Sequence, residues 1–102
     1  MSGLLYEVGF PSERVEKEFF KVLSKAVPKE RERILEWFDK LAHDPRPPGK
    51  NFKFLKGELV VFRYLAQYRI REGDWRILYD IDDIHRRVLL LAVRRRGHHA
   101  YD

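Results

Sequence analysis

The sequence predicts an α+β domain in which two amphipathic helices pack on one face of a small, mostly antiparallel sheet. Apolar residues at helical spacing fill the first half of the chain, and apolar residues that alternate with polar ones fill the second half. One further strand pattern precedes the helices, so the expected order is β-α-α-β-β-β. Because 102 residues suffice for one hydrophobic core, residues 1–102 are expected to form a single domain.

The first strand and the first helix follow from two kinds of spacing. Residues 4–10 are expected to form a strand, because every second residue from Leu4 to Phe10 is apolar. Ser12 is then placed to cap a helix, since its side chain is able to accept a hydrogen bond from the first turn. The apolar residues that recur at helical spacing are Val15, Phe19, Val22, Leu23 and Ala26.

A second helix is expected to begin at Pro28, because the missing N–H of proline is not needed in the first turn. It should end at Asp44, because a residue before a proline avoids the helical conformation. The segment 44–56 is rich in proline and then in lysine, and we expect it to be a short ordered connection within one domain. The apolar stripe of this helix is expected to be Ile34, Leu35, Phe38, Leu41 and Ala42.

Strand patterns follow in the second half of the chain. In residues 60–70 the even positions are apolar, which predicts either one long bent strand or two short ones in sequence. A glycine in residues 72–74 predicts a tight turn, after which residues 75–81 alternate again. A second turn is expected at residues 82–86, and residues 88–93 are apolar on both faces, as is typical of a strand inside a sheet.

The net charge of +5 belongs to the second half of the chain. Residues 1–49 contain nine Lys or Arg and nine Asp or Glu, whereas residues 50–102 contain twelve and seven. A one-sided basic surface suits a polyanion or an acidic protein as partner. The alternative is a soluble protein whose basic character reflects composition alone.

Other classes of protein are excluded by composition. The chain has no cysteine, so neither a disulfide framework nor a thiolate metal site is expected, which fits the reducing cytoplasm. Its apolar runs are far shorter than a membrane span, and its N-terminus has no signal-peptide pattern.

The sheet face opposite to the helices is expected to carry three arginines, because the apolar residues that alternate with them must face the core. They are Arg69, Arg71 and Arg76. Like charges side by side on neighbouring strands are unfavourable, and an anion bound between them would offset the repulsion. The guanidinium fork suits phosphate better than an ammonium group does. The alternative is a solvated face on which these arginines pair with Glu72, Asp74 or Asp80.

The last residues of the chain gather groups that bind phosphate or move protons. A phenol surrounded by guanidinium groups would be able to act as general base on a ribose 2′-hydroxyl, while an arginine stabilises the transition state. The alternative is a frayed basic tail. Adjacent histidines are a poor metal site, so no metal is expected. The residues concerned are Arg94, Arg95, Arg96, His98, His99 and Tyr101.

A resemblance to a known family rests on a central block of the sequence. Residues 68–82 combine a strand, a glycine turn, an aromatic-arginine pair and a second strand. They follow residues 45–48 (PRPP) and 55–57 (LKG), and they precede the apolar strand 88–93 and the arginine-rich segment that reaches Tyr101. On these residues the chain resembles the RelE-type toxins of the RelE/ParE superfamily, from bacterial and archaeal toxin–antitoxin pairs.

The resemblance implies a small sheet flanked by two helices, as expected above, and the activity of an mRNA interferase. RelE-type toxins enter the ribosomal A site and cleave the mRNA there by attack of a 2′-hydroxyl on the adjacent phosphate, without a metal. The implied partners are the ribosome, its mRNA and a cognate antitoxin. Neither a membrane nor a small-molecule cofactor is implied, and the implied location is the cytoplasm.

The resemblance also implies the site residues. Arg76 matches the arginine after the turn aromatic, and Tyr101 matches the late tyrosine of the family. Arg96 is the best match to the arginine after the last strand, and Arg95 takes that place if the alignment shifts by one residue. Arg69 falls where the family often has a lysine. Further phosphate-binding residues are expected to be Arg63, Arg71, Arg94, Arg95, Lys50, Lys53 and Lys56.

Gln67 departs from the family pattern, since it stands where a lysine can occur. With that basic group missing, proton transfer is expected to depend on Tyr101, His98 or His99. Two other functions stay open. A ParE-like toxin would inhibit DNA gyrase without nuclease activity, although such chains usually lack an Arg/Tyr tail. A non-catalytic relative would only bind RNA or the antitoxin.

Overall fold

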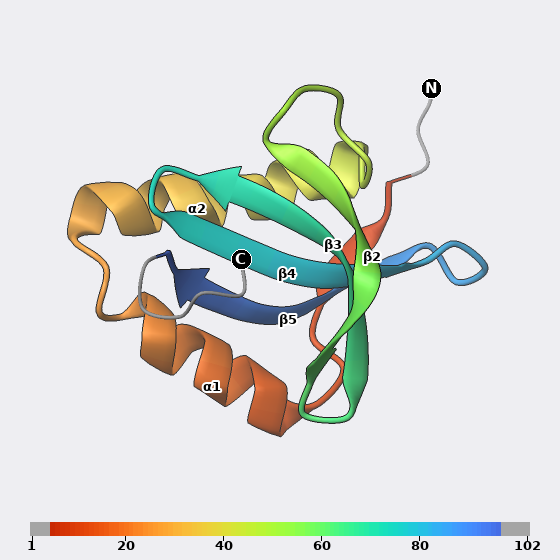
Figure 1. The fold of residues 1–102 in the computed structure, drawn as a ribbon, viewed down its shortest axis with the longest axis horizontal. Helices are drawn as coiled ribbons and strands as arrows, with labels where there is room; N and C mark the ends of the chain where they lie inside the picture. Colours follow the sequence, from red (N-terminus) through yellow and green to blue (C-terminus); the bar gives the residue numbers. More distant parts are fainter. Residues whose placement is uncertain (1–4, 97–102) are drawn as a thin grey trace.

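The computed structural model describes residues 5–96, and its helices and strands follow the order β-α-α-β-β-β-β (Figure 1). They are β1 (Glu7–Gly9), α1 (Glu13–Leu23), α2 (Pro28–His43), β2 (Phe52–Val61), β3 (Tyr64–Glu72), β4 (Trp75–Asp82) and β5 (Arg87–Arg95). Within the described range the strands form one five-stranded sheet in the order β1-β5-β4-β3-β2, and only the β1–β5 pair is parallel. The predicted α+β class is confirmed, with one strand more than expected after the helices.

Both helices begin where the sequence signals predict, and α2 ends as predicted, whereas α1 ends at Leu23, before the Ala26 that was expected to continue its apolar stripe. The Ser12 hydroxyl accepts a hydrogen bond from the backbone N–H of Val15 at 3.2 Å and so caps α1. Pro28 opens α2, and Asp44 closes it. β1 covers residues 7–9 of the strand predicted at residues 4–10, of which residue 4 lies outside the described range. Neither helix of this part of the chain is long and apolar enough to cross a membrane.

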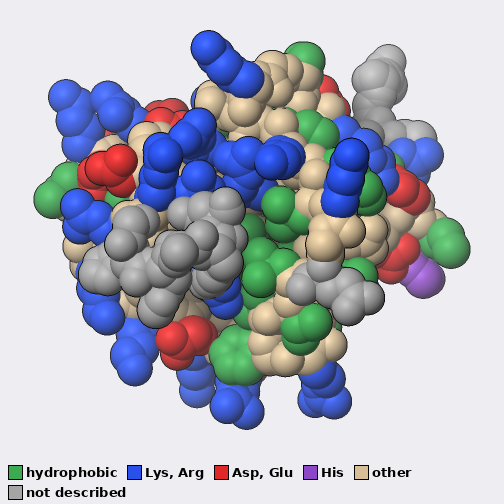
Figure 2. Space-filling model, in the orientation of Figure 1, with side chains coloured by type: hydrophobic (Ala, Val, Ile, Leu, Met, Phe, Trp, Pro, Cys, Tyr) green, Lys and Arg blue, Asp and Glu red, His purple; other side chains and the backbone are tan. Residues whose placement is uncertain are grey.

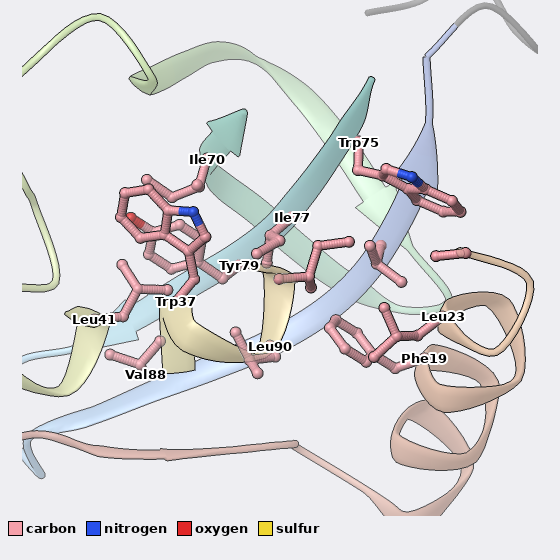
Figure 3. Packing of buried hydrophobic residues seen from close by; sticks show 13 residues of the cluster. Phe19, Leu23, Trp37, Leu41, Ile70, Trp75, Ile77, Tyr79, Val88 and Leu90 are labelled. Atoms are coloured by element: carbon pink, nitrogen blue, oxygen red, sulfur yellow. The ribbon is translucent and has the colours of Figure 1, made fainter. Parts of the chain in front are cut away.

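The two helices pack on the same face of the sheet, as predicted, and bury one hydrophobic core (Figure 3). Side chains from α1 and α2 interlock there with side chains from β3, β4 and β5. Fully buried members of this core include Phe19, Leu23, Ile34, Leu41, Ile70, Ile77, Tyr79, Val88 and Leu90. The opposite face of the sheet is therefore left open for other contacts.

The apolar stripe predicted for α2 is wrong at one position. Leu35 is 40% exposed, whereas Trp37 is buried. Trp37 lies three residues after Ile34, so the two side chains share one side of the helix, while Leu35 is turned away from it. The amphipathic face of α2 thus contains an aromatic residue with a hydrogen-bonding N–H.

Residues 52–56, predicted to belong to a connection, are instead the first half of β2. Phe52 and Phe54 alternate with Lys53, and this segment pairs with residues 68–70 of β3. β2 is an edge of the sheet, where lysine side chains discourage pairing with other strands. The prediction fails because the Pro- and Lys-rich composition conceals a strand alternation.

A turn at Phe62 and Arg63 separates β2 from β3, so residues 60–70 form two strands rather than one. Phe62 has a φ of 58°, a left-handed conformation that disfavours a non-glycine residue by about 1–2 kcal/mol. Because the chain reverses there, Val61 is buried while Val60 and Phe62 are exposed. The continuous apolar face predicted along the even positions is therefore wrong before the turn.

The predicted glycine turn is confirmed and sets the register of the β3–β4 hairpin. Gly73 has a φ of 59°, a conformation that glycine adopts without strain. Arg71 then lies directly opposite Arg76. The turn predicted at residues 82–86 is confirmed as well and leads into β5.

Hydrogen bonds of Arg46 join the Pro-rich loop after α2 to β3 and to the turn between β4 and β5. Its guanidinium donates two hydrogen bonds to Asp83, at 2.8 and 3.2 Å, and one to the Tyr68 hydroxyl at 3.1 Å. The Tyr6 hydroxyl donates another to Asp83 at 2.6 Å. Hydrogen bonds from Arg46 and Tyr6 lower the pKa of Asp83 to about 2. The loop is thus an ordered connection, as predicted, up to the start of β2.

Candidate functional site

The sheet face opposite to the helices carries a cavity of about 210 Å³, which we call the arginine cavity. Its lining consists of Lys53, Leu55, Leu59, Arg69, Arg71, Arg76, Leu78 and Arg94. Five of these side chains are basic, and among the described residues no acidic side chain lines the cavity. Figure 2 shows Lys and Arg side chains gathered over the sheet on one side of the molecule. An anion is the ligand that such a lining favours.

Three arginines form a row across β3, β4 and β5, which we call the arginine row. Arg76 lies opposite Arg71 on one side and opposite Arg94 on the other. Residues directly opposite in an antiparallel sheet have Cβ atoms about 5 Å apart, so three guanidinium groups leave the sheet from neighbouring points. Three forked donors at this spacing are able to surround one phosphate.

A basic pair lies beside the arginine row on the same face. Lys53 on β2 is opposite Arg69 on β3, and Arg69 is opposite Leu78 on β4. Along a strand, Arg69 is two residues from Arg71, a distance of about 6.6 Å. The cavity therefore offers positive charge at two separate points, which suits a ligand with more than one phosphate.

Arg76 is the most buried basic residue of the cavity, with 8% of its surface exposed. Arg69, Arg71 and Arg94 are half-buried, and Lys53 is exposed. A charge that is shielded from water interacts more strongly with an anion, because less solvent screens the interaction. A phosphate in the cavity would therefore interact most strongly with Arg76.

Hydrogen bonds to groups other than the arginines engage two acidic residues of this hairpin, Glu72 and Asp80. The Trp37 indole donates a hydrogen bond to Glu72 at 2.8 Å, and the Trp75 indole donates one to Glu30 at 3.0 Å. These bonds hold the Glu72 carboxylate on the helix side of the sheet. Burial raises the pKa of Asp80, whereas a guanidinium partner would lower it. Glu72 therefore does not pair with the arginines, contrary to the alternative considered from the sequence.

Four of the predicted phosphate-binding residues do not line the arginine cavity. Lys50 is exposed in the loop before β2, and Lys56 is exposed on that strand. Arg63 lies at the turn between β2 and β3. Arg95 lies over the ring of Trp75, 6.0 Å from its centroid, and so extends toward the helix side. The structure thus brings together only part of the predicted basic set.

The apolar floor of the cavity is a feature that the sequence reasoning missed. Leu55, Leu59 and Leu78 belong to a second, smaller hydrophobic cluster on the sheet. The signal for it is the position of Leu78 between the polar residues of β4, two residues after Arg76. The other members of this cluster are Val61, Tyr64, Ala66, Leu91 and Ala92.

No protein-family model matches this sequence, and no curated protein matches it. Solved structures do. A chain of the archaeal RelE–RelB complex from Pyrococcus horikoshii is 25% identical, with a TM-score of 0.70 over 94% of this chain and 100% of that one. A chain of the toxin–antitoxin complex RelBE2 from Mycobacterium tuberculosis is 28% identical, with a TM-score of 0.68 over 94% of this chain and 97% of that one.

In fold and in sequence, the chain is similar to these RelE-type proteins. The resemblance carried by the central block of the sequence is thereby confirmed. A doubly substituted E. coli RelE toxin in the free state has the same fold, with 20% identity and a TM-score of 0.59 over 93% of this chain and 86% of that one. At that identity the likeness concerns the fold alone.

The residues that the RelE resemblance assigns to catalysis fall into three groups. Arg69 and Arg76 line the arginine cavity. Arg96 follows β5, and its backbone N–H donates a hydrogen bond to the Asp74 carbonyl at 2.6 Å, next to the hairpin turn. His98, His99 and Tyr101 lie outside the described residues. Among the side chains that the structure describes, no group of three or more His, Cys, Asp or Glu is arranged to hold a metal ion.

Proposed function

We propose that this RelE-type protein is the toxin of a type II toxin–antitoxin pair and that it cleaves mRNA in the ribosomal A site. The observation that carries the proposal is the arginine row of Arg71, Arg76 and Arg94, with Lys53 and Arg69 beside it. Such a surface suits a polyanion held at more than one phosphate. RNA along this face would place one phosphate at the row and a neighbouring one at the basic pair.

The proposed reaction is an internal transfer of the phosphate. The ribose 2′-oxygen attacks the adjacent phosphorus while the bond from phosphorus to the 5′-oxygen breaks. A base takes the proton of the 2′-hydroxyl and an acid protonates the leaving 5′-oxygen, which gives a 2′,3′-cyclic phosphate and a 5′-hydroxyl. Negative charge grows on the other phosphate oxygens in the transition state, and Arg76 is assigned to stabilise it because it is shielded from water.

The proton transfers are assigned to the C-terminal residues. In the described range the arginine cavity is lined by Lys, Arg and Leu, and an arginine keeps its proton too strongly to act as a base. We assign the base and the acid to two of the three residues Tyr101, His98 and His99, since phenol and imidazole groups both exchange protons.

A cognate antitoxin is the proposed partner, and the cytoplasm is the proposed location. Two of the similar solved structures are toxin–antitoxin complexes, one of them named as RelE with RelB. An acidic partner would complement the basic face of this protein.

Primer extension on translating ribosomes tests the proposed function. The purified protein is expected to cleave the mRNA at the A-site codon, and at least one of Tyr101→Phe, His98→Ala and His99→Ala should slow cleavage severely. Unchanged cleavage in all three variants would contradict the assignment of the proton transfers. Inhibition of purified DNA gyrase without mRNA cleavage would establish the ParE-like function instead, and binding of RNA or antitoxin with neither activity would establish a non-catalytic relative.

A further inference from the structure

Three aromatic rings form a ladder that leads from the hydrophobic core to β2, an edge strand of the sheet (Figure 1). The ring of Tyr79 is fully buried and stacks on the ring of Tyr68, with their centroids 5.6 Å apart. Tyr68 is half-buried, and its ring contacts that of Phe54, again at 5.6 Å. Phe54 ends the ladder with 50% of its surface exposed, and we call Phe54 and Tyr68 the edge platform.

The edge platform is held in place from two sides. Phe54 and Tyr68 are directly opposite in the β2–β3 pair, so the sheet fixes the positions of both residues. Arg46 donates a hydrogen bond to the Tyr68 hydroxyl at 3.1 Å, and its guanidinium lies 5.3 Å from the centre of the Tyr68 ring. Asp83 in turn holds Arg46 through an ion pair of 2.8 Å. A ring that is already ordered loses little conformational entropy when a ligand stacks on it.

Lysines flank the edge platform along the chain. Residues 50–56 contain three basic residues and no acidic one. All three are exposed: Lys50 lies in the loop before β2, whereas Lys53 and Lys56 lie on β2 on either side of Phe54. A half-exposed aromatic ring among cations is the combination by which proteins bind single-stranded nucleic acid, because every base has a face that stacks and every nucleotide has a phosphate.

Lys53 connects the edge platform to the arginine cavity. Successive side chains of a strand point to opposite faces, so Lys53 lies on the face of the cavity, while Phe54, which contacts Tyr68, lies on the face that the helices cover. Within the described range, no strand lies beyond β2 on this side of the sheet. An RNA strand bound at the arginine cavity is therefore able to pass Lys53, cross the edge and reach Phe54.

Single-stranded RNA suits the edge platform better than another protein does. A second copy of this chain paired along β2 would bring its own lysines against these, and like charges on neighbouring strands repel. A strand of another protein would bond to the backbone of the edge, and the ring of Phe54 would contribute only apolar surface. A nucleotide matches both features, since its base stacks on the ring and its phosphate pairs with a lysine.

We propose that the edge platform is a second RNA-binding site, at which one base of a single strand stacks on Phe54 while Lys50 and Lys56 bind the flanking phosphates. The proposal relies on the proposed function only for the statement that the arginine cavity binds RNA. The strand is then held at two places, one on each side of the β2 edge. The platform adds affinity for RNA that extends beyond the cavity, and it gives a role to two lysines that do not line the cavity.

Fluorescence anisotropy with an RNA of about eight nucleotides, within the usual range of single-strand binding sites, tests the edge platform. Phe54→Ala is expected to raise the Kd for this RNA about tenfold, because one stacking contact is lost. The same oligomer without its bases keeps the phosphates, and Phe54→Ala should leave its Kd unchanged. Phe62→Ala is the matched control, since Phe62 is 46% exposed just after the other end of β2. Equal weakening by both variants, or by neither, would overturn the proposal.

Conservative variants separate stacking from a structural effect. Phe54→Tyr keeps a ring and should bind the RNA with nearly the wild-type Kd, whereas Phe54→Leu keeps only apolar surface and should bind as weakly as Phe54→Ala. If Phe54→Leu binds as tightly as wild type, no base stacks on this residue and the proposal fails. Sedimentation velocity tests the protein alternative: a wild-type dimer that Phe54→Ala dissociates would show a second copy on the platform and overturn the proposal.

None of these measurements needs ribosomes, so the edge platform and the proposed function fail separately. Loss of mRNA cleavage with RNA binding that still depends on Phe54 would contradict the proposed function alone. Cleavage of mRNA by a protein whose RNA binding does not depend on Phe54 would contradict the edge platform alone.

Discussion

At the scale of single residues, burial divides the roles of the cations in the arginine cavity. Arg76 lies in the middle of the arginine row and is largely shielded from water, while Arg71 and Arg94 are half-buried and Lys53 is exposed. Shielding strengthens an ionic interaction, whereas exposure leaves it screened by solvent and salt. Arg76 is therefore assigned to the charge of the transition state, and the others to the binding of RNA.

Arg71→Ala is expected to weaken the binding of short single-stranded RNA and to make it less dependent on salt. Loss of one phosphate contact should reduce the slope of log K against log salt by about 0.7. Fluorescence anisotropy at several salt concentrations measures this slope. Arg63→Ala removes the same charge at a turn outside the cavity and should leave the slope unchanged. The same slope for both variants would mean that Arg71 does not contact a phosphate.

Asp83 gives the stability of the fold a dependence on pH. Hydrogen bonds from Arg46 and Tyr6 lower its pKa to about 2 in the folded protein, from an ordinary value of 3.8. The unfolded chain therefore binds this proton more readily, so the stabilisation is present above about pH 4 and is lost as the pH falls toward 2. Asp83→Asn is expected to lower Tm at neutral pH, with a smaller difference from wild type near pH 2. A Tm equal to wild type at neutral pH would contradict this role.

At the scale of elements, α2 holds the hairpin that carries the arginine row. The Trp37–Glu72 and Trp75–Glu30 hydrogen bonds join α2 to the last pair of the β3–β4 hairpin. The next pair along the hairpin is Arg71 with Arg76. The position of the row on the open face is thus fixed by contacts on the opposite face.

Glu72→Ala is expected to lower the free energy of unfolding by about 1–2 kcal/mol, because the buried indole N–H of Trp37 loses its acceptor. Glu72→Gln keeps an oxygen acceptor on a side chain of equal length and should lose less than half of that amount. Urea denaturation measures both values. If the two variants lose the same stability, the hydrogen bond is not what holds the hairpin to α2.

Sequence patterns predict the elements well where local signals act alone. Ser12, Pro28 and Gly73 each mark a boundary by their own backbone chemistry, and each is confirmed. The patterns fail where tertiary contacts decide. Phe62 occupies a left-handed turn that no propensity favours, and the strand alternation around Phe52 is concealed by proline and lysine.

At the scale of the whole molecule, the chain separates its charge into two layers. The helices come from the first 49 residues, which contain nine basic and nine acidic residues, and the basic strands come from the remainder, which contains twelve and seven. The strand order places β4 between β3 and β5, so that arginines distant in the sequence form one row.

Strand alternation predicts only part of the set of cations that line the arginine cavity. Alternation places Arg69, Arg71 and Arg76 on the open face, because it depends on each strand alone. The presence of Arg94 and Lys53 beside them depends on strand order and register, including the shift between Leu78 and Tyr79 on β4. Alternation within a strand contains no information about strand order or register. Composition indicates both Arg94 and Lys53 as phosphate-binding, but it indicates four cations outside the cavity equally, so the sequence does not separate the cations of the site from the others.

The rate of mRNA cleavage on ribosomes saturated with the protein tests the central role of Arg76 most directly. Arg76→Ala should cleave about 100- to 1,000-fold more slowly than wild type, because the transition state loses its shielded cation. Arg63→Ala, with the same net charge, should cleave at nearly the wild-type rate. Equal rates for Arg76→Ala and Arg63→Ala, with both proteins folded, would contradict the account.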